Sequence, residues 1–329
     1  MFVNFFVVHW APGGPIDQML HRMQSKDTEN SGVSVNAGVG HSYYQETAEK
    51  LKKQYGFDKP LIPRFFYMVK KYVCFDFGRS YFKNENVLKL IADRLPISLS
   101  LGLWSTLLIY SLAIPLGILK AVRNGSAFDV CSSLLILIGY AIPTFLFAVI
   151  LIIFFAGGSF FAWFPLQGLF SYNFSSLSPL QQCADYFWHL ALPIMAKVIT
   201  SLAGLTMMVK NSFLEEIGKQ YVITAQAQGF STKAVLLKHV FQNAMLIIIA
   251  SLPITLMQVV FSESFLIETI FSLDGLGLMG YEAILNRDYP IIFGSLYIFT
   301  LIGLILHLIG DFIYTHIDPR IHFRGLSEQ

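Results

Sequence analysis

The sequence predicts an all-α integral membrane protein with an external cap. Hydrophobic residues make up 54% of the 329 residues and charged residues only 13%, a balance that is not typical of soluble domains. Five stretches are apolar over roughly the 20 residues that a helix needs to cross a bilayer. The basic residues are scattered at a formal net charge of +2, so nothing favours a nucleic-acid partner.

The chain opens on an apolar, aromatic stretch at residues 1–11, "MFVNFFVVHWA". A helix of this length is about 16 Å long, roughly half of a 30 Å hydrocarbon core. We therefore interpret residues 1–11 as part of a first transmembrane helix. Either translation begins upstream of Met1 or this helix is shortened.

Residues 12–95 form the predicted external loop and cap. The part at about 25–50 is small, polar and nearly free of aliphatic residues, which predicts a mobile loop. Beyond it, in "LKKQYGFDKPLIPRFFYMVKKYVCFDFGRSYF", aromatic residues alternate with Lys and Arg, as in a cap that anchors to lipid headgroups. Cys74 and Cys183 both fall in predicted external segments, so a disulfide between them is an alternative to free thiols.

The transmembrane domain is predicted at 96–313, with spans at about 97–119, 130–155, 190–209, 244–263 and 289–313. Its orientation follows from the short loops, since Lys and Arg are retained on the cytoplasmic side. Lys120 and Lys210 lie in loops of one side, whereas residues 156–189 contain no Lys or Arg. The loop 210–243 and the tail 314–329 are therefore predicted to be cytoplasmic.

Few ionisable residues lie in the spans. Lys197, Glu268 and Asp311 lie near span ends, where we expect them to reach water or headgroups. An ion-coupled carrier usually has acidic or His relays near the midplane. The spans offer uncharged polar groups instead, and the candidate translocation path consists of Thr106, Ser201, Thr206, Thr255 and Gln258.

Sequence motifs for catalysis are absent. The chain has no phosphate-binding GxxxxGK loop, no nucleophile elbow and no HExxH pair. The three cysteines are far apart and have no His or Cys at metal-ligand spacing. We therefore predict no catalytic residue, no metal site and no cofactor in this chain, and expect the energy for any transport to come from elsewhere.

The predicted cytoplasmic loop contains a helical hairpin. Phe213, Ile217, Tyr221 and Ala225 recur at spacings of four, which predicts a helix over 211–225. Gly229 is suited to end this helix and Ser231 to cap a second one. Two short helices at an angle would present a compact knob to a soluble partner; a helix that rests on lipid is the alternative.

This hairpin resembles the EAA loop of binding-protein-dependent ABC importers, in the form found in peptide permeases. The resemblance rests on "YVITAQAQG" and "HVFQNA", and Lys233 lies nearby. Other stretches resemble the same family in order, among them "NFFVVHWAPGGP", "YGFDKPLIPRF", "ESFLIETIFSLDGLGLMGYEAILNRDYPIIFG" and "DFIYTHIDPRI". The run "LGLWSTLLIYSLAIPLGILKAVRNGSAFD" is similar to the Yej-type branch. The matching loop positions are Tyr221, Thr224, Ala225, Ala227 and Gly229.

The resemblance implies a type I ABC importer transmembrane domain of six helices in the bacterial inner membrane. It implies a non-catalytic permease subunit that moves oligopeptides or peptide-like compounds, such as microcin C, from periplasm to cytoplasm. The implied partners are a second permease, two ATP-binding subunits that hold ATP and Mg²⁺ and dock on the EAA loop, and a periplasmic solute-binding protein.

One departure from the family pattern concerns docking. Gln226 and Gln228 stand where the family usually has basic residues. Exposed ion pairs contribute only about 0 to 1 kcal/mol each, so we expect docking to be weakened rather than lost. An ion-coupled secondary transporter and a non-transporting membrane scaffold remain the alternatives.

Overall fold

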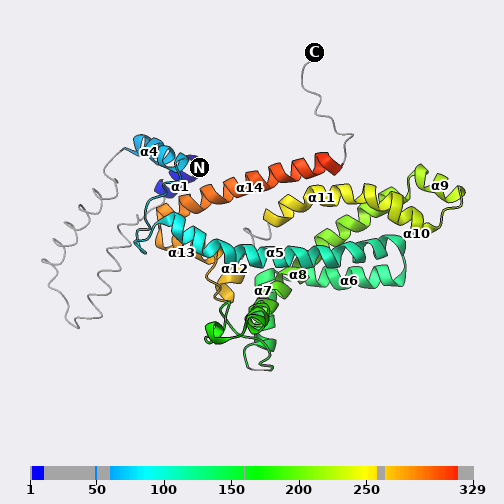
Figure 1. Cartoon of the computed structure of the whole chain (residues 1–329), viewed down its shortest axis with the longest axis horizontal. Helices are drawn as coiled ribbons and strands as arrows, with labels where there is room; N and C mark the ends of the chain where they lie inside the picture. The colour runs from blue at the N-terminus through cyan, green and yellow to red at the C-terminus, as the bar shows by residue number, and fades with distance from the viewer. Residues whose placement is uncertain (1, 11–48, 50–59, 159, 258–263, 318–329) are drawn as a thin grey trace, which may run out of the picture. The chain divides into compact units, whose positions relative to one another are not determined.

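The computed structural model describes residues 2–10, 49, 60–158, 160–257 and 264–317, and its regular elements in these ranges are helices (Figure 1). The chain divides into two units. The cap unit is Met1–Leu95 with Met279–Leu301, and the core unit is Pro96–Leu278 with Ile302–Gln329. The cap unit thus includes residues 279–301, which the sequence analysis assigned to the transmembrane domain. Cys74, Cys131 and Cys183 are exposed cysteines, and because Cys74 and Cys183 belong to different units, a disulfide between them stays a prediction.

Four helical runs in the described residues are long and apolar enough to cross a membrane. They are α5 (Val87–Val122), α8 (Pro179–Ile217), Thr232–Met257 and the Tyr289–Ile313 part of α14 (Tyr289–Ile317). They coincide with four of the predicted spans, although residues 258–263 of one span lie outside the described residues. At 36 and 39 residues, α5 and α8 are about 54 and 58 Å long, well beyond a 30 Å core.

The helix expected over 130–155 is interrupted. It consists of α6 (Ala127–Ala141) and α7 (Thr144–Phe155), which meet at 94°. Pro143 lacks a backbone N–H and disfavours helical backbone at the residue before it. Ile142 accordingly has extended backbone, with φ −89° and ψ 122°. Pro115, Pro193 and Pro253, by contrast, lie inside continuous helices.

The cap unit has an aromatic core. In α1 (Phe2–Trp10), Phe5 is buried and its ring centroid lies 5.3 Å from that of Phe65 in α4 (Leu61–Val73) and 5.8 Å from that of Phe293. The turn between α13 (Leu276–Asn286) and α14 is held by Asp288, which accepts hydrogen bonds from Ser80 Oγ at 2.5 Å and Tyr81 N at 3.3 Å. Burial raises the pKa of the Asp288 carboxyl. Part of the predicted cap is therefore a packed structure.

Two charged residues are more deeply buried than the sequence predicts. Lys197 and Glu268 were expected to reach water or headgroups, but both are fully buried in the core unit. Glu268, in α12 (Ser264–Ile270), accepts hydrogen bonds from Ser98 Oγ at 2.5 Å and Leu278 N at 2.9 Å. Burial raises its pKa, and the nearby positive charge of Lys197 opposes that rise. Hydrogen bonds to the carboxylate and an opposite charge thus compensate for the lost water.

Small residues bring the core helices close together. A Cβ on Gly117 of α5 would lie 2.6 Å from Val209 Cβ of α8, and a Cβ on Gly139 of α6 would lie 3.0 Å from Ile199 Cγ2. Such close backbone approach is the usual way in which membrane helices pack without a hydrophobic driving force. Packing of α5 and α6 on α8 fixes the helix from which the predicted coupling hairpin continues.

Candidate functional site

The hairpin between the third and fourth predicted spans begins at the end of α8. The helix expected over 211–225 is two helices, because α8 ends at Ile217 and α9 (Gln220–Ala227) begins after Lys219. Gly218 N donates to the Leu214 carbonyl, and Lys219 has extended backbone. The chain therefore turns at Gly218 and Lys219, inside the stretch for which the apolar spacing predicted one continuous helix.

The tip of the hairpin has the local geometry expected from Gly229 and Ser231. Gly229 has φ +89°, in the left-handed region that glycine adopts most easily, and its N–H donates to the Gln226 carbonyl at 2.9 Å. Ser231 Oγ then accepts a hydrogen bond from Ala234 N at 3.4 Å, which caps α10 (Thr232–Val235). A π-helical turn, Leu236–Val240, connects α10 to α11 (Phe241–Met257).

Side chains close the base of the hairpin. Tyr221 Oη donates to Glu216 Oε2 at 2.7 Å and accepts from Asn243 Nδ2 at 3.3 Å. One phenol thus links the first arm of the hairpin, α8 and α9, to the second arm, α10 and α11. Ser212 Oγ also donates to the Ala244 carbonyl at 2.8 Å. Lys219 pairs with Glu216, and this hydrogen-bonded ion pair raises the pKa of Lys219. Burial raises the pKa of the Tyr221 phenol. The two arms therefore share one hydrogen-bonded base.

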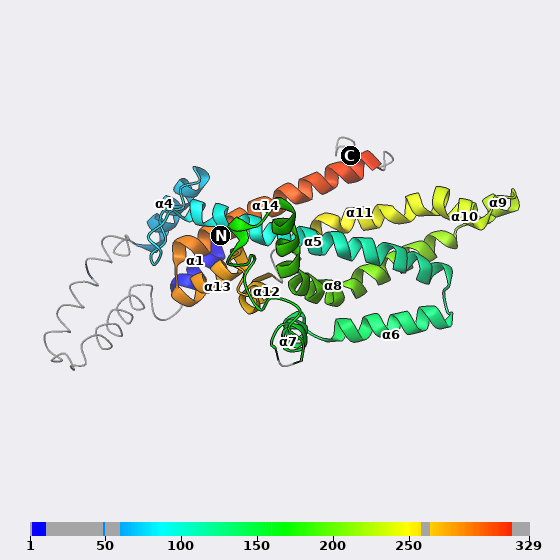
Figure 2. The same cartoon turned by 60° about the horizontal axis from the view of Figure 1, so that its bottom comes forward.

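The predicted coupling residues divide into two sets. Tyr221 and Ala225 face inward and are half-buried, whereas Thr224, Ala227, Gly229 and Lys233 are exposed. Large apolar side chains lie beside the exposed set: Ile223, Phe230 and Leu237 are 62%, 49% and 69% exposed. Figures 1 and 2 both show α9 and α10 projecting beyond the ends of the long core helices. The hairpin thus presents an apolar surface with basic residues on a braced stem.

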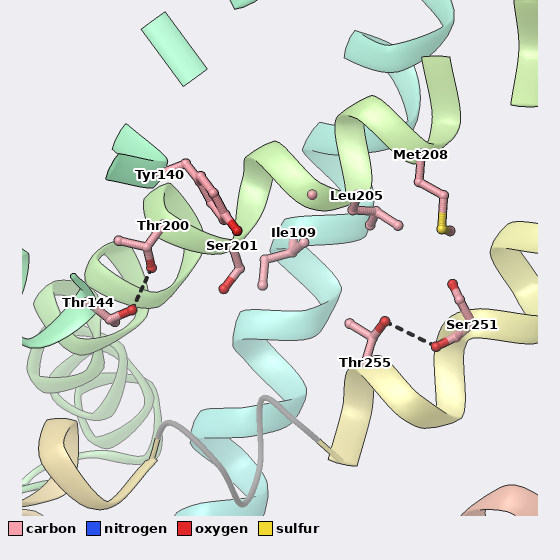
Figure 3. Close-up of a pocket in the computed structure, with 10 residues that line it drawn as sticks. Ile109, Tyr140, Thr144, Thr200, Ser201, Leu205, Met208, Ser251 and Thr255 are labelled. Atoms are coloured by element: carbon pink, nitrogen blue, oxygen red, sulfur yellow. Dashed lines mark hydrogen bonds between the residues drawn. The ribbon is translucent and has the colours of Figure 1, made fainter. Parts of the chain in front are cut away.

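The second candidate site is a cavity of about 330 Å³ in the core unit (Figure 3). It lies between α5, α6, α7, α8 and α11, and hydroxyl groups dominate its polar lining. Thr144 and Thr200 hydroxyls are 3.0 Å apart, and Thr255 Oγ1 accepts a hydrogen bond from Tyr110 Oη at 3.3 Å. The lining residues are Ile109, Tyr140, Thr144, Thr200, Ser201, Gly204, Leu205, Met208, Ser251 and Thr255. None of them is charged.

Two of the five predicted path residues, Ser201 and Thr255, line this cavity. Thr106 and Thr206 do not; both are buried, and their hydroxyls have no hydrogen-bond partner in the described part of the chain. Gln258 lies outside the described residues. Tyr140 and Thr144 were missed in the sequence, and the signal for them was Pro143, which breaks the helix between these two residues and turns α7 aside.

A buried charge cluster braces the cytoplasmic ends of α5, α6 and α8, as oriented by the loop charges. Asp129, near the start of α6, lies 3.1 Å from Lys120 Nζ and 2.8 Å from Lys210 Nζ. Lys120 is fully buried, and its Nζ also donates to Ser132 Oγ at 2.9 Å and Ser133 Oγ at 2.6 Å. In the sequence, these two lysines count only as part of the positive charge of the loops. The one available signal was Asp129, the single acid in that short loop.

Comparison with known proteins identifies related chains. Residues 113–323 match the family model "Binding-protein-dependent transport system inner membrane component". The chain is 53% identical over 345 aligned positions to the inner membrane ABC transporter permease protein YejB of Escherichia coli O157:H7, covering 98% of this chain and 94% of the relative. It is 49% identical over 342 positions to the peptidoglycan transport system permease protein YejB of Agrobacterium fabrum, covering 98% and 93%.

More distant relatives share the architecture. The oligopeptide transport system permease protein AppB of Bacillus subtilis is 30% identical over 322 positions, with 98% of this chain and 93% of the relative covered. Among solved structures, an inward-facing MetNI methionine ABC transporter chain is similar with a TM-score of 0.53 and 18% identity, covering 70% of this chain and 97% of that chain. At this identity the similarity shows the fold alone.

We predict that Asp129→Asn lowers the thermal stability of the protein, because it leaves two lysine ammonium groups without a counter-charge, one of them fully buried. Thermal unfolding of the purified protein in detergent measures the effect. Asp311→Asn is the matched control, since Asp311 is exposed and a surface change usually stays within about 0.5 kcal/mol. Equal losses in the two variants would contradict a bracing role for the cluster.

Proposed function

Since the chain belongs to the family of binding-protein-dependent transport system inner membrane components, we propose that it is the permease subunit of an ATP-driven importer that carries oligopeptides or peptide-like compounds into the cytoplasm. The observation that carries this proposal is the exposed hairpin on its hydrogen-bonded base, together with similarity to peptide permeases along nearly the whole chain. The chain is a multi-pass protein of the bacterial inner membrane with the type I importer fold.

The hairpin is proposed as the docking site of an ATP-binding subunit. Its exposed surface combines Ile223, Phe230 and Leu237 with Lys233, and aromatic and aliphatic anchors are what a protein groove binds most strongly. The chain itself carries no phosphate-binding loop. ATP and Mg²⁺ are therefore assigned to two ATP-binding subunits, and this chain is assigned no catalytic step.

Two further partners complete the proposed importer. A second permease chain would share the pathway, and a periplasmic solute-binding protein would deliver the substrate to the external face. Closure of the ATP-binding subunits would then bias the spans between inward- and outward-facing states, as a ligand biases any two-state element for which it has different affinities.

The hydroxyl-lined cavity is the proposed part of the translocation path in this chain. Hydroxyl groups both donate and accept hydrogen bonds, so they suit the amide groups of a peptide backbone without selecting one side chain. Because no lining residue is charged, the cavity offers no ion pair to a charged substrate, which favours release of the substrate over its retention. Microcin C is one candidate substrate, and the name of the Agrobacterium relative, a peptidoglycan transport system permease, adds peptidoglycan as a second.

Purification from native membranes in mild detergent tests the subunit assignment. Mass spectrometry should find a second permease and an ATP-binding subunit with this chain, and the preparation should hydrolyse ATP. A chain that comes out alone and supports no ATP hydrolysis would overturn the proposal and favour a carrier or scaffold. Uptake by proteoliposomes with and without ATP separates these two, because an ion-coupled carrier transports without an ATPase.

We predict that Gly229→Asp abolishes ATP-driven uptake while the protein remains in the membrane. Any L side chain at φ +89° is strained by about 1–3 kcal/mol, and the strain falls on the exposed tip rather than the core. Peptide uptake and membrane abundance are measured together. Gly158→Asp is the matched control, since Gly158 has φ +70° and open space but lies in the α7–α8 loop. Normal uptake by Gly229→Asp would refute coupling through the tip.

We also predict that Thr255→Val lowers peptide uptake about five-fold, because a lost hydrogen bond is worth roughly 1 kcal/mol, without lowering basal ATP hydrolysis. The substitution conserves shape and removes a hydroxyl that lines the cavity and accepts from Tyr110. Thr300→Val is the control, since Thr300 is exposed and donates to its own helix at the Leu296 carbonyl. If both variants transport equally well, the cavity is not part of the path.

A further inference from the structure

The cap unit contains a cavity that the proposed function does not use. Its volume is about 560 Å³, within the usual range for small-molecule sites. It is bordered by α1, α13 and the first part of α14, which lie together in Figures 1 and 2. The lining is largely aliphatic and aromatic and includes Val7, Ile284, Ile292, Leu296 and Phe299.

One guanidinium group borders this cavity. Arg287 lies between α13 and α14 with φ +54°, and its Nη1 atom is buried without a hydrogen-bond partner in the described part of the chain. The adjacent carboxylate of Asp288 is already engaged by Ser80 and Tyr81. A buried donor without an acceptor is costly. The arrangement therefore favours an acceptor in the cavity, and an anion is the acceptor that a guanidinium prefers.

The rest of the cavity fits a hydrocarbon chain. Ile292, Leu296 and Phe299 are spaced by three and four residues, so they form one face of α14. Ser295 on the same stretch has a buried hydroxyl with no partner in the described residues. From Tyr289, the first residue of α14, to Ser295 the helix rises about 9 Å at 1.5 Å per residue. A ligand that matches this cavity carries an anionic group beside Arg287 and a hydrocarbon chain along the apolar wall. Such a molecule is an amphiphile.

We propose that this cavity binds a membrane phospholipid with an anionic headgroup, whose phosphate accepts hydrogen bonds from Arg287 and whose acyl chain lies along α14. The predicted orientation puts the α13–α14 turn at the outer membrane surface, where headgroups are found. A peptide fits poorly, because no described carboxylate lines the cavity to accept its terminal ammonium group. This inference does not depend on which solute the importer carries.

Lipid binding to the purified protein, with the subunits that accompany it, tests the proposal. After delipidation, phosphatidylglycerol in mixed micelles is titrated and bound lipid is counted by native mass spectrometry. Arg287→Gln should weaken binding about ten-fold, the loss expected for one charge-assisted hydrogen bond. Arg79→Gln should bind like the wild type, because Arg79 is an exposed arginine of the same unit. Equal binding by these two variants would overturn the proposal.

Two further experiments identify the source of the anion and control for misfolding. Gly280→Leu fills the cavity from α13, where an added Cβ meets no atom within 4 Å, so this variant should fold and lose the lipid. Glycerol 1-phosphate offers the same phosphate without acyl chains and should not compete. Competition by glycerol 1-phosphate would identify a free-phosphate site instead, and undiminished lipid binding by Gly280→Leu would exclude this cavity as the lipid site.

Discussion

Backbone hydrogen bonding in hydrocarbon is the constraint on which the rest of this structure depends. Lipid offers no acceptor for an N–H or donor for a C=O, so non-helical backbone at membrane depth is tolerated only where protein or a cavity surrounds it. Prolines 115, 193 and 253 are therefore absorbed within continuous helices. The chain departs from helix at Ile142 and Pro143, and the flanking residues Tyr140 and Thr144 line the hydroxyl-rich cavity. The break and the cavity are thus two aspects of one arrangement.

The core unit has strong polar interactions at its two ends and weak ones between them. Asp129 with Lys120 and Lys210 ties three helices together at one end, and Glu268 with Ser98 and the Leu278 amide does so at the other. Between these clusters the cavity is lined by uncharged groups. Buried ion pairs are costly to break by removing one partner, whereas neutral hydrogen bonds exchange readily. The ends are therefore suited to move as rigid blocks, and the middle is suited to change shape.

The sequence predicted features that depend on neighbouring residues. The spans followed from apolar length, and the turn at Gly229 and the cap at Ser231 followed from local backbone chemistry. Features that depend on distant partners were not predictable. Asp129 has two lysine partners, one of them 81 residues away, and the buried Glu268 accepts a hydrogen bond from Ser98, 170 residues away in sequence. Nor does the sequence tell Pro143, which breaks a span, from Pro253, which does not. The early end of α8 at Ile217 was missed because apolar spacing continues past Gly218.

The hairpin's second arm continues without a break into a membrane helix, since Thr232–Met257 is a single helical run of 26 residues. Ser231 at its tip and Ser251 at the cavity are separated by 20 positions along this run. The π-helical turn at Leu236–Val240 lies between them and is the place where the run would bend. Beyond the turn, the helix rises about 16 Å from Val240 to Ser251, so a tilt of about 10° at the turn displaces Ser251 by about 3 Å. The geometry is that of a lever, in which movement of the hairpin in the cytoplasm is transmitted along the helix to the cavity in the membrane.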